Sequence, residues 1–173
     1  MPADPRQLLV LYEEPEQSVT IGGSALSEEL RRFYASARPQ VSPGWLARLR
    51  SAAGGGPDPW HHGFFLAERA RGEIIGTAGF KGPPDGDGMV EIAYGVVPSV
   101  EGRGYATEAA GALVRFAAAD ERVRLIRAHT LPELNASTRV LRKCGFVHIG
   151  EVIDSEDGPV WRWERAAHHI GTP

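Results

Sequence analysis

The chain has 173 residues, with 19 Lys and Arg against 22 Asp and Glu, and a formal net charge of −3. Its length suits a single domain spanning residues 1–173. Hydrophobic residues make up 42% of the chain and charged residues 24%, a composition that excludes a wholly disordered chain. The slight acidic excess disfavours the broad basic surface that non-specific nucleic-acid binding requires, so we expect no nucleic-acid partner. A single cysteine, Cys144, excludes an intrachain disulfide and disfavours a cysteine zinc site.

Signals for export, membrane insertion and metal binding are weak throughout the sequence. No apolar run approaches the ~20 residues of a membrane helix, and the apolar patch Leu8–Tyr12 ends at Glu13, unlike a signal peptide. The histidine pairs His61–His62 and His168–His169 have no acid or cysteine at ligand spacing. We therefore expect a cytoplasmic protein with no metal and no membrane partner.

The first third of the chain is predicted to be mostly helical. The apolar segment Gln7–Tyr12 is interpreted as an opening strand. Ser27 is a good N-cap for a helix in which Leu30 and Phe33 fall at helical spacing, and a second helix is predicted to begin near Pro43.

Strands dominate after residue 63. Two segments rich in Gly and Pro, residues 54–59 and 81–88, indicate loops within one domain. Between and after them, alternating apolar residues predict an antiparallel meander of three strands at Phe64–Ala67, Ile74–Phe80 and Met89–Val97. Further elements follow in the order helix, strand, helix, strand, strand, at Ala106–Ala119, Leu125–His129, Asn135–Cys144, Phe146–Ile153 and Val160–Glu164. This order predicts the α+β class, with a central mixed, mostly antiparallel sheet flanked by helices.

A glycine-rich turn joins the strand Met89–Val97 to the next helix. Gly102 and Gly104 allow a tight backbone turn, and the first N–H groups of the following helix lack intrahelical partners. Such a helix start is suited to a phosphate or pyrophosphate. The chain has no Gly-Lys-Ser/Thr of a P-loop, and Thr107 stands where a dinucleotide fingerprint needs its third glycine.

The segment Gly102–Ala109 resembles motif A of the GNAT N-acetyltransferase superfamily. The segment Asn135–Phe146 resembles motif B of its ribosomal-protein branch, the RimJ/RimL type, and the resemblance covers roughly residues 64–165. It implies a sheet splayed between the fourth and fifth strands. It also implies an enzyme that moves an acetyl group from acetyl-CoA directly to the primary amine of a peptide or a small molecule.

The resemblance also implies which residues bind the cofactor. They are the residues of the turn and helix start, together with one strand residue and one residue of motif B: Val97, Gly102, Arg103, Gly104, Tyr105, Ala106, Thr107 and Asn135. The family usually has Gln or Arg where this chain has Glu101, so we expect the Glu101 side chain to face solvent. Glu108 is interpreted as stabilising the helix dipole.

Two residues are candidates for acid–base chemistry. An ammonium acceptor must lose a proton before it attacks, and Glu91, on the strand before motif A, is the candidate base; the alternative is an exposed carboxylate. The resemblance implies that Ser137 protonates the leaving thiolate, because Leu141 replaces the tyrosine that many members use. The alternative for Asn135 and Ser137 is helix capping.

Two functions from different classes remain open on the sequence. The first is the N-acetyltransferase, acting as a monomer or homodimer on a peptide or small-molecule amine. The second is a non-catalytic module that binds or senses CoA on the same fold. Release of free thiol in the presence of amines would separate them.

Overall fold

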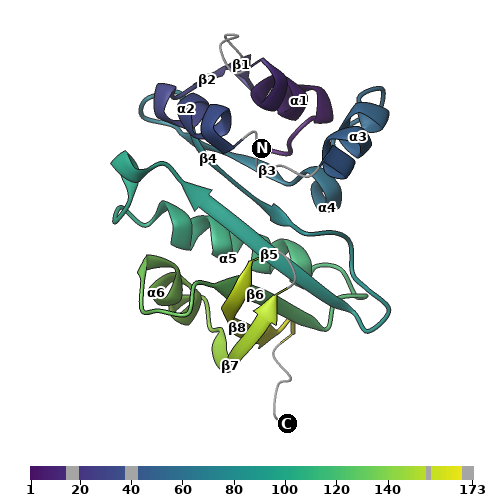
Figure 1. Cartoon of the computed structure of the whole chain (residues 1–173), viewed down its shortest axis with the longest axis vertical. Coiled ribbons are helices and arrows are strands. Elements are labelled where there is room, and N and C mark those ends of the chain that lie inside the picture. Colours follow the sequence, from purple (N-terminus) through teal and green to yellow (C-terminus); the bar gives the residue numbers. More distant parts are fainter. Residues whose placement is uncertain (15–19, 38–42, 155–156, 169–173) are drawn as a thin grey trace. The chain divides into compact units, whose positions relative to one another are not determined.

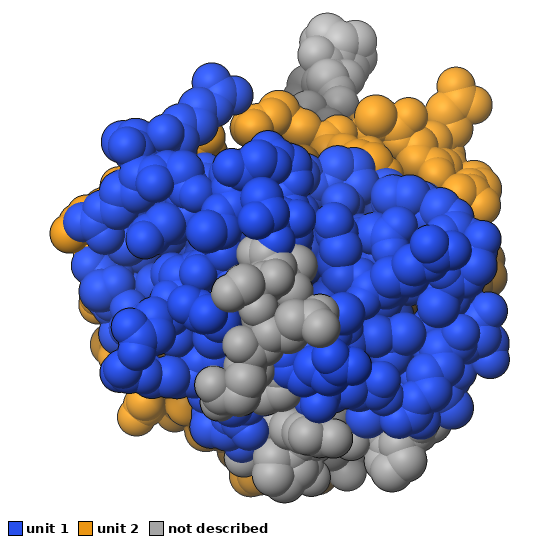
Figure 2. All heavy atoms as spheres, turned by 90° about the horizontal axis from the view of Figure 1, so that it is seen from above, with its two compact units in different colours: residues 1–79, 95–100 blue, residues 80–94, 101–173 orange. Residues whose placement is uncertain are grey.

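The computed structural model describes residues 1–14, 20–37, 43–154 and 157–168 (Figure 1). Its contacts divide the chain into two compact units, coloured separately in Figure 2. The first unit comprises Met1–Gly79 and Gly95–Val100, and the second comprises Phe80–Tyr94 and Glu101–Pro173. A single domain over residues 1–173 stays a prediction.

The helices of the first unit are α1 (Pro5–Glu13), α2 (Glu28–Ala37), α3 (Pro43–Ala52) and α4 (Pro59–His62). The prediction of a strand at Gln7–Tyr12 is wrong, because this segment lies inside α1. The Asp4 side chain caps that helix by accepting from the Arg6 N–H at 2.8 Å. Three of its leucines are buried, so the apolar run reflects burial on several sides and carries no strand alternation.

The capping prediction for α2 is confirmed. Ser27 Oγ accepts a hydrogen bond from the Leu30 N–H at 3.2 Å. The buried face of α2 carries Leu30 and Tyr34, whereas Phe33 is 58% exposed and does not belong to the core. In α3, Leu49 is buried.

The strands of the first unit are β1 (Thr20–Ile21), β2 (Ser24–Leu26), β3 (Phe64–Glu68) and nearly all of β4 (Glu73–Phe80). β1 and β2 form an antiparallel hairpin, β2 runs parallel to β4, and β3 runs antiparallel to β4. A short 3₁₀ turn, Pro98–Val100, completes the unit.

β5 (Met89–Val96) contributes residues to both units. Within the first unit, the Val97 N–H donates to the Ile75 carbonyl at 2.9 Å, and within the second, the Lys81 N–H donates to the Glu91 carbonyl at 2.9 Å. Both bonds fit the antiparallel meander predicted for β3, β4 and β5. In the first unit, a Cβ on Gly76 would lie 2.2 Å from the Gly95 carbonyl oxygen, so only glycine fits there.

The second unit contains α5 (Tyr105–Ala118), β6 (Leu125–Thr130), α6 (Ala136–Lys143), β7 (Val147–Asp154) and β8 (Gly158–Ala166). Its strands follow the order β5-β6-β8-β7, in which β5 and β6 are parallel and the other pairs are antiparallel. The core combines small residues of α5 with large side chains of α6 and the strands, among them Ala110, Leu113, Ile126, Leu141 and Trp163.

The pairing of β5 with β6 is short. It runs from Met89 opposite Leu125 to Glu91 opposite Arg127, although both strands continue for several residues beyond. They are the fourth and fifth predicted strands when the segment Gln7–Tyr12 is counted, so their separation agrees with the expected splay. The α+β class and the mixed, mostly antiparallel sheet of eight strands flanked by helices are confirmed.

Candidate active site

The start of α5 has the geometry expected of an anion site. Gly102 and Gly104 have φ of +74° and +91°, a conformation that side-chain-bearing residues rarely adopt. Gly104 is the N-cap and supplies no side-chain bond to the helix. The first intrahelical bond runs from the Glu108 N–H to the Gly104 carbonyl, so the N–H groups of the turn before it point beyond the helix.

The predicted cofactor residues divide between the two units. Gly102, Arg103 and Gly104 are exposed, and Tyr105, Ala106 and Thr107 are half-buried, all within the second unit. Val97 belongs to the first unit and is buried, with its N–H committed to Ile75. Glu101 is exposed, which agrees with the expectation that its side chain faces solvent.

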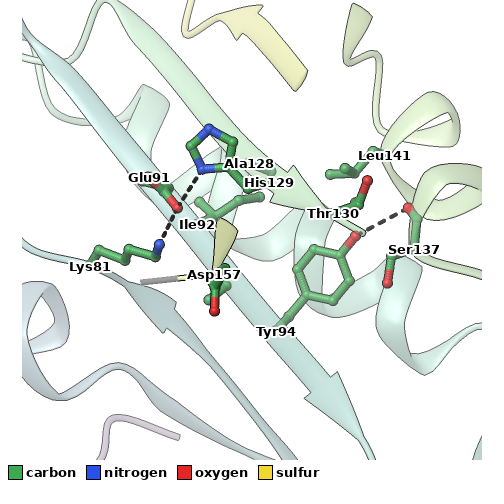
Figure 3. A pocket seen from close by; sticks show the side chains of 11 residues that line it. Lys81, Glu91, Ile92, Tyr94, Ala128, His129, Thr130, Ser137, Leu141 and Asp157 are labelled. Atoms are coloured by element: carbon green, nitrogen blue, oxygen red, sulfur yellow. Dashed lines mark hydrogen bonds and ion pairs between the residues drawn. The ribbon is translucent and has the colours of Figure 1, made fainter. Parts of the chain in front are cut away.

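A cavity of about 190 Å³ lies in the second unit where β5 and β6 separate. Figure 3 shows the side chains that line it: Lys81, Glu91, Ile92, Ala93, Tyr94, Ala128, His129, Thr130, Ser137, Leu141 and Asp157. Successive residues of β5 and of β6 point to opposite faces of the sheet, so the cavity is lined from both faces. Its volume is below the ~300–1,000 Å³ of typical ligand sites, which suits reacting groups rather than a whole cofactor.

Glu91 is held inside this cavity and is not an exposed carboxylate. Its side chain is 15% exposed, and its Oε1 lies 2.7 Å from Lys81 Nζ and 3.0 Å from His129 Nδ1 (Figure 3). The alternative of an exposed strand-end acid is therefore wrong.

The charge of Glu91 is balanced locally by Lys81. Burial works against the charged form of Lys81, but the hydrogen bond and the negative charge of Glu91, together with Asp154 and Asp157, outweigh it and raise the pKa of Lys81. Lys81 therefore carries its charge at neutral pH.

Ser137 lies at the other end of the cavity, in the first turn of α6. The Tyr94 hydroxyl donates to the Ser137 backbone oxygen across 3.5 Å, linking β5 to the start of α6 (Figure 3). Burial, with a smaller contribution from Cys144, raises the pKa of Tyr94, so this phenol stays protonated. Leu141, which replaces the tyrosine of many family members, is fully buried and also lines the cavity.

Asn135 is the N-cap of α6, as its capping alternative proposed. Its Oδ1 accepts from the Thr138 N–H at 3.0 Å, and its own N–H donates to Thr138 Oγ1 at 3.2 Å, which forms a capping box. The side-chain oxygen is thus used within the helix. Ser137 lies inside α6 and does not occupy the cap position.

Sequence reasoning missed five polar residues of the cavity: Lys81, Tyr94, His129, Thr130 and Asp157. Their positions depend on how the strands of the second unit pair and on where the pairing of β5 with β6 ends, which no local pattern reveals.

Within the described ranges, no group of His, Cys, Asp and Glu could hold a metal ion. In the same part of the chain, no helix has both the length and the apolar character needed to cross a membrane. The Nδ1 atom of His61 lies 2.8 Å from Asp58 Oδ2, a contact between two side chains and not a cluster of metal ligands.

A family model described as an acetyltransferase (GNAT) domain matches residues 2–147. The chain belongs to this family. The match covers both the turn at Gly102–Gly104 and the strands that line the cavity, so both lie within the GNAT domain.

A curated relative is similar in sequence, and solved structures are similar in fold. An uncharacterized N-acetyltransferase of Bacillus subtilis, YjdG, is 35% identical over 92 residues, 53% of this chain and 52% of that protein. The matched region thus spans about half the length of this curated relative. A GNAT-family acetyltransferase from Bacillus anthracis has a similar fold, with a TM-score of 0.54 and 20% identity over 91% of this chain and 81% of that one.

A second fold relative is the spermidine N-acetyltransferase of Vibrio cholerae, solved with CoA and spermine. Its TM-score is 0.52, with 16% identity over 60% of this chain and 64% of that one. At this identity the likeness concerns the fold alone.

Proposed function

We propose that the protein is an N-acetyltransferase that moves the acetyl group of acetyl-CoA to a primary amine. The observation that carries the proposal is that Glu91 and Ser137 line one cavity at the point where β5 and β6 separate. A base and an acid at opposite ends of one small cavity suit a reaction that removes one proton and delivers another.

The start of α5 would hold the pyrophosphate of the cofactor. The two glycines with positive φ and the uncapped helix start fit this group, because backbone N–H groups and the helix dipole both favour an anion. Arg103, exposed beside them, would add positive charge. Asn135 uses its side-chain oxygen in the cap, so only its amide nitrogen would be available to the cofactor.

The reaction would proceed by direct attack, without a covalent enzyme intermediate. The ammonium acceptor gives a proton to Glu91, the amine nitrogen forms a bond to the acetyl carbon, and the carbon–sulfur bond breaks. The nitrogen of the tetrahedral intermediate loses its second proton to solvent, so the amide forms without charge. Ser137 gives its hydroxyl proton to the departing thiolate and is reprotonated from solvent. Glu91 releases the acceptor proton to solvent after the amide product has formed.

The motif B residues favour the RimJ/RimL branch and hence a peptide N-terminus as one candidate acceptor, beside small-molecule amines. The binding-module alternative is favoured by one observation, the ion pair between Glu91 and Lys81, because the lysine already occupies one oxygen of the carboxylate. A cytoplasmic location and a monomer or homodimer remain predictions.

The decisive experiment measures free CoA thiol with acetyl-CoA and a panel of peptides, polyamines, aminoglycosides and amino acids. We expect at least one amine to release thiol at a rate above hydrolysis. Glu91→Gln should lower kcat by about 100-fold or more while acetyl-CoA affinity changes little. Tight acetyl-CoA binding with no acceptor-dependent thiol from any amine class would favour the sensing module.

A further inference from the structure

A line of hydrogen-bonded side chains crosses three strands of the second unit. Arg162 Nε on β8 donates to His129 Nε2 on β6 at 3.3 Å, and His129 Nδ1 lies 3.0 Å from Glu91 Oε1 on β5. Arg162 and His129 are directly opposed in the β6–β8 register. The imidazole thus has a partner at each nitrogen. Its side chain is 10% exposed and is largely shielded from water.

The two contacts of His129 specify its tautomer. A guanidinium has only N–H donors, so Nε2, which faces it, must be the acceptor and carries no proton. A neutral imidazole has one donor and one acceptor nitrogen, so the proton lies on Nδ1 and is donated to Glu91 Oε1.

This arrangement prevents His129 from acting as the base. A second proton would have to go on Nε2, where it would break the bond from Arg162 and face a fixed cation. With Nδ1 as a donor and Nε2 as an acceptor, neither nitrogen is open to the acceptor amine, and its proton has to go to the Glu91 carboxylate.

Two donors converge on the same carboxylate oxygen. Lys81 and His129 both contact Oε1, and neither contact involves Oε2. We propose that His129, with its tautomer held by Arg162, is a positioning residue that fixes the Glu91 carboxylate so that Oε2 receives the proton of the acceptor amine. This inference rests on the proposed function, because it concerns the residue that prepares the proposed base.

The other charged groups around His129 are accounted for. Next to it on the same strand face, Arg127 donates to Glu164 through Nε at 2.8 Å, so these two charges compensate each other. Asp157 lines the cavity from the β7–β8 turn, and its negative charge is among those that raise the pKa of Lys81. Arg162 is thus the cation that faces Nε2 directly.

The first test reads the tautomer in the full-length protein, without any substrate. Long-range ¹H–¹⁵N NMR at a pH of about 8, where an ordinary imidazole is neutral, distinguishes the two tautomers. We expect the Nδ1–H form for His129 in the wild type and a shift toward the Nε2–H form in Arg162→Met. The matched control Arg127→Met, on the neighbouring cross-strand pair, should leave the tautomer unchanged. An Nε2–H form in the wild type would overturn the inference, whatever the protein acetylates.

The second test separates positioning from packing by kinetics. His129→Asn places an amide N–H near the position of Nδ1, whereas His129→Leu supplies no donor. With an acceptor found in the amine screen, we expect His129→Leu to lower kcat about tenfold with little change in KM for acetyl-CoA, and His129→Asn to recover most of it. Equal kcat in both variants and the wild type would refute the positioning role and leave the proposed function intact. If no amine is acetylated, the proposed function fails, the positioning role fails with it, and the NMR result still decides the tautomer.

Discussion

The capping box of α6 allows a prediction that separates stability from cofactor binding. In Asn135→Ala, the Thr138 N–H loses the acceptor that lies at 3.0 Å. Replacing an Asn cap by Ala costs about 1 kcal/mol of unfolding free energy. For a chain of this size, that loss lowers Tm by about 2–4 °C.

Asn135→Asp is the matched control. A carboxylate oxygen can accept the same bond, and its negative charge is favourable at a helix start, so we expect Tm within about 1 °C of the wild type. If the amide nitrogen of Asn135 also binds acetyl-CoA, Asn135→Asp loses affinity at unchanged stability. Thermal unfolding measures the first effect and titration calorimetry with acetyl-CoA the second. An Asn135→Ala protein as stable as the wild type would refute the capping argument.

Three further substitutions test the backbone and the core. Gly76→Ala should lower the unfolding free energy in urea by about 2 kcal/mol or more, because its Cβ would meet the Gly95 carbonyl oxygen at 2.2 Å. The control Gly95→Ala, whose Cβ meets nothing within 4 Å, should change the unfolding free energy by less than about 0.5 kcal/mol. Equal losses in the two variants would contradict the close approach at Gly76. Gly104→Ala, at a φ of +91°, should cost about 1 kcal/mol and weaken acetyl-CoA binding at least severalfold by calorimetry. The helix-interior control Gly111→Ala should instead gain about 0.5–1 kcal/mol and bind acetyl-CoA normally, and weakened binding in both variants would remove the argument from the turn. Trp163→Phe should lower the unfolding free energy in urea by about 2 kcal/mol. The change removes volume from a fully buried site and removes the 3.1 Å hydrogen bond that Nε1 donates to Thr130 Oγ1. A loss below about 0.5 kcal/mol would show that the site repacks freely.

Local patterns in the sequence were sufficient for the elements from residue 64 onward. The predicted strands and helices there agree with the observed bounds to within about two residues, because Gly and Pro punctuate clear two-residue and helical periods. The two helices that were missed, α1 and α4, begin in the same way: Asp4-Pro5 and Asp58-Pro59 each combine an N-cap with a proline in the first turn. That local signal was available and would have corrected both predictions.

The candidate site was predictable only in part, for a physical reason. Glu91 and Ser137 could be proposed because each lies in a recognisable segment, and the cavity contains both. The partners of Glu91 could not, because Lys81 and His129 reach it through strand register, which relates residues far apart in the chain. The same holds for Arg162, which is paired to His129 only once β6 and β8 are aligned.

The half-exposed ammonium group of Lys81 has a consequence for turnover. On the proposed reaction, Lys81 keeps its contact with Oε1 while a charged acceptor approaches Oε2, so the carboxylate faces two cations before the proton moves. The amide product has neither the charge nor the basic nitrogen that drew the acceptor to Oε2. Lys81 therefore remains the charged partner of Glu91 after the amide forms, which favours product departure over rebinding.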